Sequence, residues 1–406
     1  MTAVEASNAI ALPDRRVIVT ALGITQILAW GSTFYLLGVL ANPVARDTGW
    51  GYEWVMAGVS AGLLVAGLVS PRVGRAISEW GGRPVLAASA GLLALGLLLL
   101  GSSQNLPWYL AAWIIVGAGM GAGLYDAAFS ALGSIYGKDA RSPITWVTLF
   151  GGFASTVCWP LSAFLVEHLG WRGACFVYAG IQLGFALPIH LLVLPRRAVA
   201  APGNDGPRAV PDNRLRVEER AIFATLSVVL TLGAAILSMI GMHLLPLLQA
   251  RGIDLAAAVA LGMIVGPSQV GARVLEMLGG RHYHPIWTMV ASTVLVAIGT
   301  LLLYLNFPIY ALAIILYGAG NGIGSIARGT LPLALFGPQR YPVLMGRLAL
   351  PILLSMSLSP LVGAFVFKLA GADGMLGLLT AIAAVNVLLV AVLWSLNRRR
   401  TSGPRH

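Results

Sequence analysis

Three ionisable side chains lie deep inside long apolar stretches of the sequence, namely Asp126, Arg273 and Arg328. An ionisable group within a lipid bilayer is costly, so each of the three is a candidate functional residue. A buried carboxyl group can exchange a proton or pair with a cation. A guanidinium group presents paired donors that match a carboxylate. These residues therefore predict proton exchange and anion binding, and they supply no catalytic residue.

An internal repeat relates two of these residues. The glycine-rich segment at 117–123 recurs at 318–324, which is an offset of 201 residues. This offset places Asp126 opposite the residue before Arg328, so the acid and the base are expected at similar depths in two repeated halves. We predict that they face one cavity, where an anionic substrate or a proton competes for their pairing. The alternative is a fixed ion pair that holds helices together.

Arg273 lies six residues before the expected end of its helix at Gly279. A second repeat match, of 75–83 with 273–281, makes Arg75 its partner. Arg75 is expected at a cytoplasmic helix end, which favours a gating or interfacial role for Arg273. Carboxylate binding is the other interpretation, and both stay open.

The composition indicates the elements that hold these residues. The chain has 406 residues, of which 58% are hydrophobic and 10% are charged, and its mean hydropathy is +0.83. In a typical soluble domain, roughly a quarter of all residues are charged. Because lipid satisfies no backbone hydrogen bonds, long unbroken apolar runs predict spanning helices, whereas a barrel would show short alternating strands.

Ten stretches contain no Asp, Glu, Lys or Arg and are long enough to consider as spans. They cover 17–45, 54–71, 84–125, 142–166, 173–195, 221–250, 255–272, 282–327, 348–367 and 374–397. One crossing needs about 20 residues. The third and eighth stretches are each broken by an Asn-x-Pro turn signal and therefore hold two crossings. The sequence predicts an all-α polytopic membrane protein with twelve transmembrane helices.

The two repeat matches divide these helices into two parallel halves of six. We predict an N-terminal bundle over 1–194, a polar cytoplasmic linker over 195–220 and a C-terminal bundle over 221–406. With the N-terminus inside, 21 of the 26 Lys and Arg residues fall in cytoplasmic segments. This bias predicts that both termini are cytoplasmic in an inner membrane. It accounts for the net charge of +11 without nucleic acid as a partner.

The two cysteines, Cys158 and Cys175, fall within or beside apolar stretches and indicate neither a disulfide framework nor a metal site. No nucleotide-binding motif is present, and no cofactor is expected. Parallel six-helix halves around a central site favour alternating access over a channel.

Six plus six spans joined by a polar linker resemble the major facilitator superfamily over essentially the whole chain. The segment Gly74-Arg75-Ala76-Ile77-Ser78-Glu79-Trp80-Gly81-Gly82-Arg83-Pro84 resembles the signature loop that follows the second helix of that family. Ser78 stands at the usual acidic position, whereas Glu276 occupies it in the second half. The resemblance implies a gate function for a set of charged residues: Arg75, Glu79, Arg83, Glu276 and Arg281.

Within the superfamily, the segments 47–50 and 269–273 are similar to the monocarboxylate-porter branch. That similarity implies an Asp-x-x-x-Arg pair whose arginine engages a substrate carboxylate. Arg273 is present here, but Gln269 replaces the acid. The further candidates for lining the cavity are Tyr35, His243 and Asn321, with packing as their alternative role.

These observations predict a secondary transporter that moves a small, monocarboxylate-like organic anion by alternating access, coupled to protons and active as a monomer. The first alternative is efflux of a drug, metabolite or metalloid by proton antiport. A non-transporting receptor or assembly factor is the second alternative.

Overall fold

The computed structural model describes residues 14–195, 215–279 and 282–402. Within these residues the regular elements are all helical, and no strand is present. The helices are α1 (Arg15–Gly31), α2 (Leu37–Thr48), α3 (Tyr52–Trp80), α4 (Gly82–Gly101), α5 (Leu106–Gly123), α6 (Tyr125–Tyr136), α7 (Arg141–Gly151), α8 (Ala154–Ile181), α9 (Leu187–Val193), α10 (Val217–Ala250), α11 (Leu255–Met263), α12 (Val265–Gly279), α13 (Pro285–Tyr304), α14 (Tyr310–Phe336) and α15 (Tyr341–Ser402). The prediction of an all-α fold is confirmed.

The described helices make twelve crossings, because several crossings are split and two helices contain a reversal. Eight helical stretches are long and apolar enough to span a membrane, and two of them, with 88 and 60 residues, far exceed one crossing. Within these two stretches, α8 and α15 reverse at Gly170 (φ 69°) and Gly371 (φ 65°). The crossings are α1–α2, α3, α4, α5–α6, α7–α8, α8–α9, α10, α11–α12, α13, α14 and the two arms of α15.

Turn glycines recur at equivalent places in the two halves. Three pairs have positive φ, Gly49 with Gly252, Gly137 with Gly337, and Gly170 with Gly371. Their separations of 200 to 203 residues match the repeat offset seen in the sequence. Glycine takes positive φ without a Cβ penalty, so the turns of one half are repeated in the other. The prediction of two parallel six-helix repeats is confirmed.

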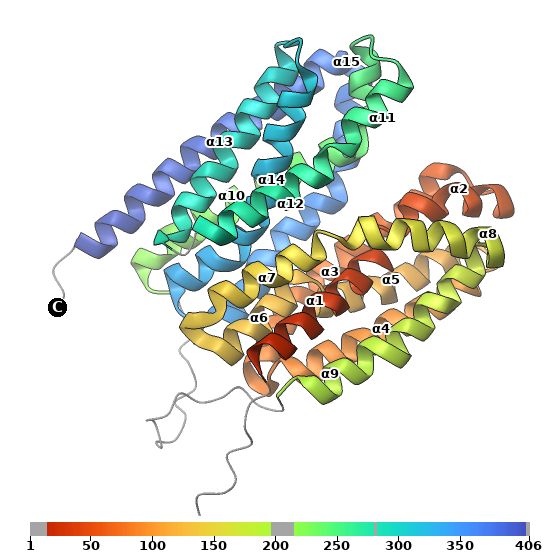
Figure 1. The fold of residues 1–406 in the computed structure, drawn as a ribbon, viewed down its shortest axis with the longest axis horizontal. Helices are drawn as coiled ribbons and strands as arrows, with labels where there is room; N and C mark the ends of the chain where they lie inside the picture. Colours follow the sequence, from red (N-terminus) through yellow and green to blue (C-terminus); the bar gives the residue numbers. More distant parts are fainter. Residues whose placement is uncertain (1–13, 196–214, 280–281, 403–406) are drawn as a thin grey trace, which may run out of the picture.

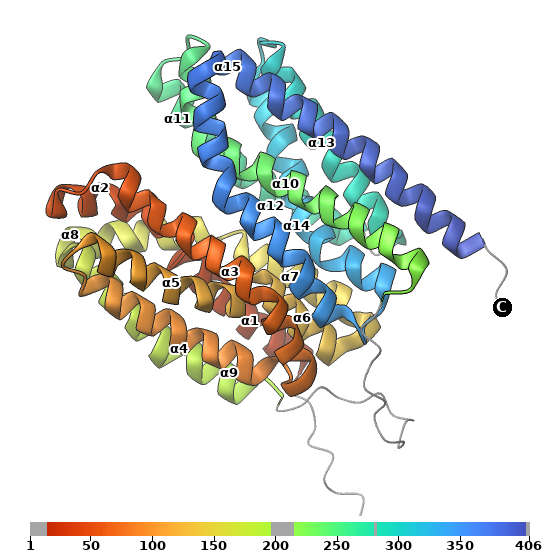
Figure 2. The same ribbon diagram turned by 180° about the vertical axis from the view of Figure 1, so that it is seen from behind.

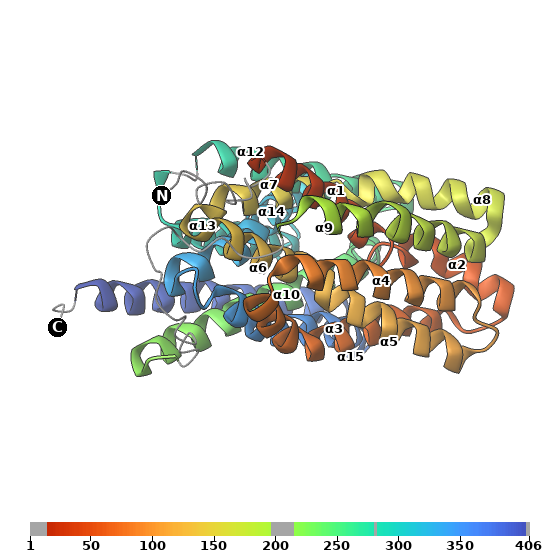
Figure 3. The ribbon, with the colours of Figure 1, turned by 90° about the horizontal axis from the view of Figure 1, so that it is seen from below.

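The two halves meet at one end of the molecule, which we call the linker end because α9 ends and α10 begins there (Figure 1). Residues 196–214 of the predicted linker are outside the described residues. α10 begins at Val217, so the last predicted linker residues are already helical. Figure 3 shows the start of α10 and the end of α15 projecting side by side at this end.

Glycines allow the halves to approach closely at the linker end. Figure 2 shows α3 running beside the first arm of α15. A Cβ on Gly74 would lie 2.4 Å from the Pro342 carbonyl oxygen, and a Cβ on Gly346 would lie 2.4 Å from the Ser70 carbonyl oxygen. Since both contacts are with backbone, only glycine fits at these positions.

At the opposite end, the ion pairs among the described residues stay within each half. In the N-terminal half, Asp47 accepts hydrogen bonds from Trp171 at 2.9 Å and Arg172 at 3.3 Å. In the C-terminal half, Arg251 pairs with Asp373 at 2.5 Å. Figure 1 shows the two halves diverging toward this end.

The first crossing is broken between α1 and α2, although the sequence predicted one uninterrupted span over 17–45. The hydroxyl of Thr33 donates to the Ala29 carbonyl at 2.6 Å, and Gln182 donates to the Ser32 hydroxyl at 3.0 Å. Side-chain bonds of this kind compete with the helical hydrogen-bond ladder and satisfy the backbone that it leaves free. The break places Tyr35 in a non-helical turn.

Candidate functional site

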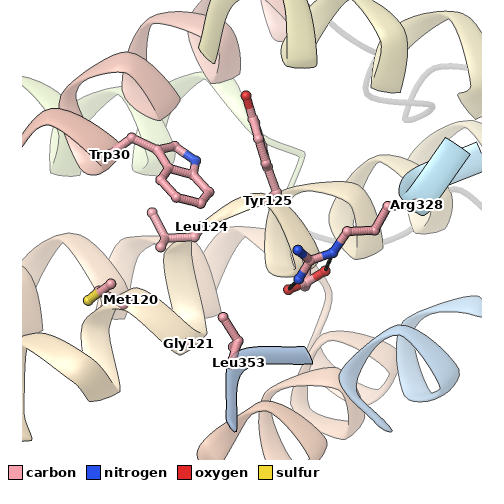
Figure 4. A pocket seen from close by; sticks show the side chains of 8 residues that line it. Trp30, Met120, Gly121, Leu124, Tyr125, Arg328 and Leu353 are labelled. Atoms are coloured by element: carbon pink, nitrogen blue, oxygen red, sulfur yellow. Dashed lines mark hydrogen bonds and ion pairs between the residues drawn. The ribbon is translucent and has the colours of Figure 1, made fainter. Parts of the chain in front are cut away.

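Asp126 and Arg328 form a two-point ion pair between the halves (Figure 4). Arg328 donates from Nε to Oδ1 at 3.0 Å and from Nη2 to Oδ2 at 2.5 Å. The side chains are only 12% and 18% exposed, respectively. The structure therefore brings together the acid and the base that the repeat placed at similar depths.

Local backbone features position both members of the pair. Leu124 is extended (ψ −170°), so α5 ends and α6 starts one residue before Asp126. The carboxylate thus lies in the first turn of a half-helix, where the helix dipole favours negative charge. On the other side, a Cβ at Gly329 would collide with Phe129, so glycine lets α14 approach α6.

A small cavity borders the pair, with room for about one water molecule. It is lined by Trp30, Met120, Gly121, Leu124, Tyr125, Asp126, Arg328 and Leu353. Most of these residues are apolar, so the ion pair is the main polar feature of the cavity lining. The indole Nε1 of Trp30 is buried and has no hydrogen-bond partner among the described residues.

Arg273 is held in a different way. Its Nε donates to the Gly322 carbonyl at 3.1 Å, and its Nη1 donates to the Thr148 carbonyl at 3.0 Å. The residue is 5% exposed, and among the described residues no carboxylate forms an ion pair with it. Two neutral carbonyls stabilise the guanidinium but leave its charge uncompensated. Since Thr148 lies on α7 and Gly322 on α14, Arg273 bridges the two halves.

The remaining lining candidates lie at separate places. A Cβ on Gly322 would lie 2.4 Å from the Gln269 carbonyl oxygen, so α12 packs tightly on α14 beside Asn321. Tyr35 packs against Trp30, with ring centroids 6.2 Å apart. His243 bonds to the Met239 carbonyl at 3.0 Å on α10. His243 does not line the cavity at the Asp126 pair.

The predicted gate residues behave differently in the two halves. Glu276 is buried and accepts hydrogen bonds from Thr288 at 2.7 Å and from Tyr283. Arg141 of the other half lies 3.7 Å from it. Although Tyr283 is partly exposed, desolvation of its phenol and the hydrogen bond to Glu276 raise the pKa of Tyr283 to about 12, so this phenol stays protonated and donates.

The corresponding first-half residues form no such cluster. Arg75 and Glu79 are exposed and Arg83 is half-buried. None of the three makes an ion pair with another described residue. Arg281 lies outside the described residues. The sequence did not identify Arg141, because its pairing with Glu276 depends on how the halves dock.

Comparison with known proteins settles the family. The sequence profile of the Major Facilitator Superfamily matches residues 22–283. The chain belongs to the major facilitator superfamily. It is a multi-pass membrane transporter and not an enzyme.

Curated relatives of this superfamily chain include two monocarboxylate transporters. Monocarboxylate transporter 11 of Mus musculus is 28% identical over 141 residues, which are 34% of this chain and 30% of that protein. Monocarboxylate transporter 3 of Rattus norvegicus is 29% identical over 154 residues, which are 36% of this chain and 30% of that protein. The matched region therefore spans about a third of the length of these relatives.

Solved structures share the fold across nearly the whole chain. The human organic anion transporter MFSD10 (TETRAN) has a TM-score of 0.70 and 16% identity, covering 93% of this chain and 100% of that one. The E. coli fucose:proton symporter FucP has a TM-score of 0.67 and 14% identity, covering 96% and 100%. A second FucP structure, described as being in the outward conformation, has a TM-score of 0.68 and 14% identity, covering 95% and 99%. At these identities the likeness shows the fold.

Proposed function

We propose that this transporter moves a small organic anion of the monocarboxylate type across the cytoplasmic membrane, coupled to protons. The observation that carries the proposal is Arg273, a buried arginine between the halves whose described partners are two carbonyl groups. A buried charge without a counter-charge is costly, so an anionic ligand at this point is stabilised. The guanidinium suits a carboxylate because it offers parallel donors.

The Asp126–Arg328 pair is the proposed coupling element. It joins α6 of one half to α14 of the other, and protonation of Asp126 removes one charge from the bridge. Since a buried unpaired arginine is unfavourable, loss of that charge weakens the closed arrangement of the halves. Proton binding and separation of the halves at the linker end are thereby linked.

Orientation follows from the positive charge at the linker end. If that end is cytoplasmic, the halves are closed toward the cytoplasm and diverge toward the outside. A substrate then reaches Arg273 from outside, and release requires that Arg273 give up its bond to Thr148 across the interface. The site lies within one chain, which supports a functional monomer.

The test is uptake of labelled lactate and pyruvate into proteoliposomes, with protein-free liposomes as the control for passive permeation. We expect uptake that is faster with an inward proton gradient and that collapses when the gradient is dissipated by an ionophore. Lactate and pyruvate uptake no faster than that of protein-free liposomes under any gradient contradicts the proposal.

A second candidate function is efflux of lipophilic cations by proton antiport. Three apolar side chains beside Asp126 favour this function, namely Met120, Leu124 and Leu353. The pairing of Asp126 with Arg328 argues against it, because the carboxylate is already neutralised. Proton-driven accumulation of ethidium by inverted vesicles, unaffected by lactate, would favour efflux.

A further inference from the structure

An array of aromatic rings lies on the N-terminal half beside Arg273. Five rings form it, and we call them the aromatic wall: Trp30, Phe34, Tyr35, Tyr125 and Trp159. Each ring is within 5.0 to 6.2 Å of another member, measured between centroids. Such spacings and the tilted or edge-on geometries are those at which aromatic rings attract one another.

The aromatic wall connects two cavities. Trp30 and Tyr125 line the small cavity at the Asp126–Arg328 pair (Figure 4). Trp159 lines a wider pocket of about 450 Å³ between α2 and α8, which is a largely open groove. Tyr35 contacts both Trp30 and Trp159, so it joins the two ends.

Arg273 is adjacent to the middle of this wall. Its Nη1 and the phenol of Tyr125 both donate to the Thr148 carbonyl, at 3.0 and 3.4 Å. The charge of Arg273 also acts electrostatically on the phenol of Tyr35. A carboxylate bound by the guanidinium therefore has ring faces and edges within reach of the rest of the molecule.

The wall has four polar groups, and two of them are occupied by hydrogen bonds within the protein. The indole Nε1 of Trp159 donates to the Tyr35 carbonyl at 3.2 Å, and Tyr125 is bonded to Thr148. Trp30 Nε1 is the one buried donor of the wall without a partner among the described residues. A substrate rich in hydroxyl groups would leave its own groups unpaired here, whereas a planar apolar substituent would not.

Building on the proposed function, we propose that the preferred substrates are carboxylates that carry an aromatic ring. The carboxylate pairs with Arg273, and the ring packs against the exposed side of Trp30 and Tyr35, toward the wider pocket. Short aliphatic acids share the carboxylate contact but gain little from the wall, so the wall sets the specificity.

The test is isothermal titration of the purified full chain with three sodium salts: phenylacetate, cyclohexylacetate and propionate. Phenylacetate and cyclohexylacetate have the same carboxylate and similar size, and they differ in the aromatic ring. We expect phenylacetate to bind about tenfold more tightly than cyclohexylacetate, because ring–ring contacts add to apolar burial.

Variants locate the source of this preference. Trp30→Leu is expected to remove most of the difference between phenylacetate and cyclohexylacetate, and a thermal unfolding transition like that of the wild type shows that the variant is folded. Trp54→Leu is the matched control, since Trp54 is exposed and makes no ring contact with another described residue.

Two results overturn the inference without touching the proposed function. Equal affinity of the wild type for phenylacetate and cyclohexylacetate is one, and an unchanged preference in Trp30→Leu is the other. Failure of all three carboxylates to bind contradicts the proposed function itself.

Discussion

The two halves share a scaffold and differ in their charged residues. Their turn glycines are equivalent, and Gly170 and Gly371 reverse the chain at the same place in each half. Arg75 is exposed, whereas its repeat partner Arg273 is buried at the interface. Asp126 in the N-terminal half has no acidic counterpart in the other half, which carries Arg328 next to the equivalent position.

The features that the halves share belong to the fold, whereas the charged residues in which they differ belong to the proposed site. Bilayer crossing and tight packing depend on apolar helices and glycines, and duplication can keep these in both halves. A binding site between the halves needs complementary groups on its two sides. To the proposed site the N-terminal half contributes an acid and the aromatic wall, while the C-terminal half contributes the buried Arg273 and the half-buried Arg328. Changing equivalent residues in the two halves is therefore the sharpest way to test the account.

The largest difference is expected between Arg273→Gln and Arg75→Gln. Arg273→Gln removes the proposed carboxylate partner, and loss of a buried charge-assisted contact reduces uptake of labelled lactate by more than about a hundredfold. Arg75→Gln changes an exposed residue at the equivalent position and should keep uptake within about twofold of the wild type, since surface charges contribute little. Similar losses in both variants would mean that the two arginines share one role.

Breaking the Asp126–Arg328 pair is expected to have the next largest effect. Asp126→Asn leaves Arg328 buried without a counter-charge and lowers the free energy of unfolding by about 3–5 kcal/mol. Adding Arg328→Gln should recover much of that loss in a thermal unfolding measurement. Both variants should lose the response of transport to a proton gradient while substrate exchange continues. A gradient response that persists in Asp126→Asn removes Asp126 from the coupling mechanism.

The acidic gate residues provide a smaller, paired comparison. Glu276→Gln weakens the contact with Arg141 across the halves, so the linker end should open more often, by about fivefold or roughly 1 kcal/mol. Glu79→Gln should leave opening unchanged, because Glu79 is exposed and unpaired among the described residues. Labelling of a cysteine introduced at Ser70 by a membrane-impermeant thiol reagent, in inverted vesicles, measures the opening. Equal labelling of the two variants argues against the asymmetric gate.

The smallest predicted difference between the halves concerns their turn glycines, for which equal costs are expected. Gly170→Ala and Gly371→Ala should each cost about 1–2 kcal/mol, since an alanine at positive φ is strained. An added Cβ meets nothing within 4 Å at either position, so sterics contribute nothing further. Gly180→Ala is the control, with open space and an ordinary helical φ. Chemical unfolding in detergent measures all three, and unequal costs at Gly170 and Gly371 would show that the reversals are not equivalent.

Much of the fold was predictable because a bilayer restricts the possibilities. Charge-free stretches located the crossings, and the Asn-x-Pro signals correctly divided two long stretches, since α4 ends at Gly101 before α5 starts at Leu106. The breaks at 32–36 and at Leu124 were not predicted. Their residues are as apolar or small as the rest of the crossing, and the breaks depend on contacts such as Gln182 with Ser32.

In the candidate site, the sequence predicted only the positions whose depth in the membrane the internal repeat indicates. The offset of 201 residues placed Asp126 and Arg328 at the same level, and the structure shows them paired. The carbonyl partners of Arg273 and the pairing of Arg141 with Glu276 come from contacts between halves, on which a single sequence carries no signal. The aromatic wall was also missed as a unit, because its members come from three separate helices and the turn after α1. Their roles in transport stay predictions.

The most direct test compares Arg273, which has no carboxylate partner among the described residues, with Arg328, which pairs with Asp126. Isothermal titration with phenylacetate should detect binding to the wild type and to the double variant Asp126→Asn/Arg328→Gln, and none to Arg273→Gln. Binding to Arg273→Gln with wild-type affinity would contradict the central claim that Arg273 receives the substrate carboxylate.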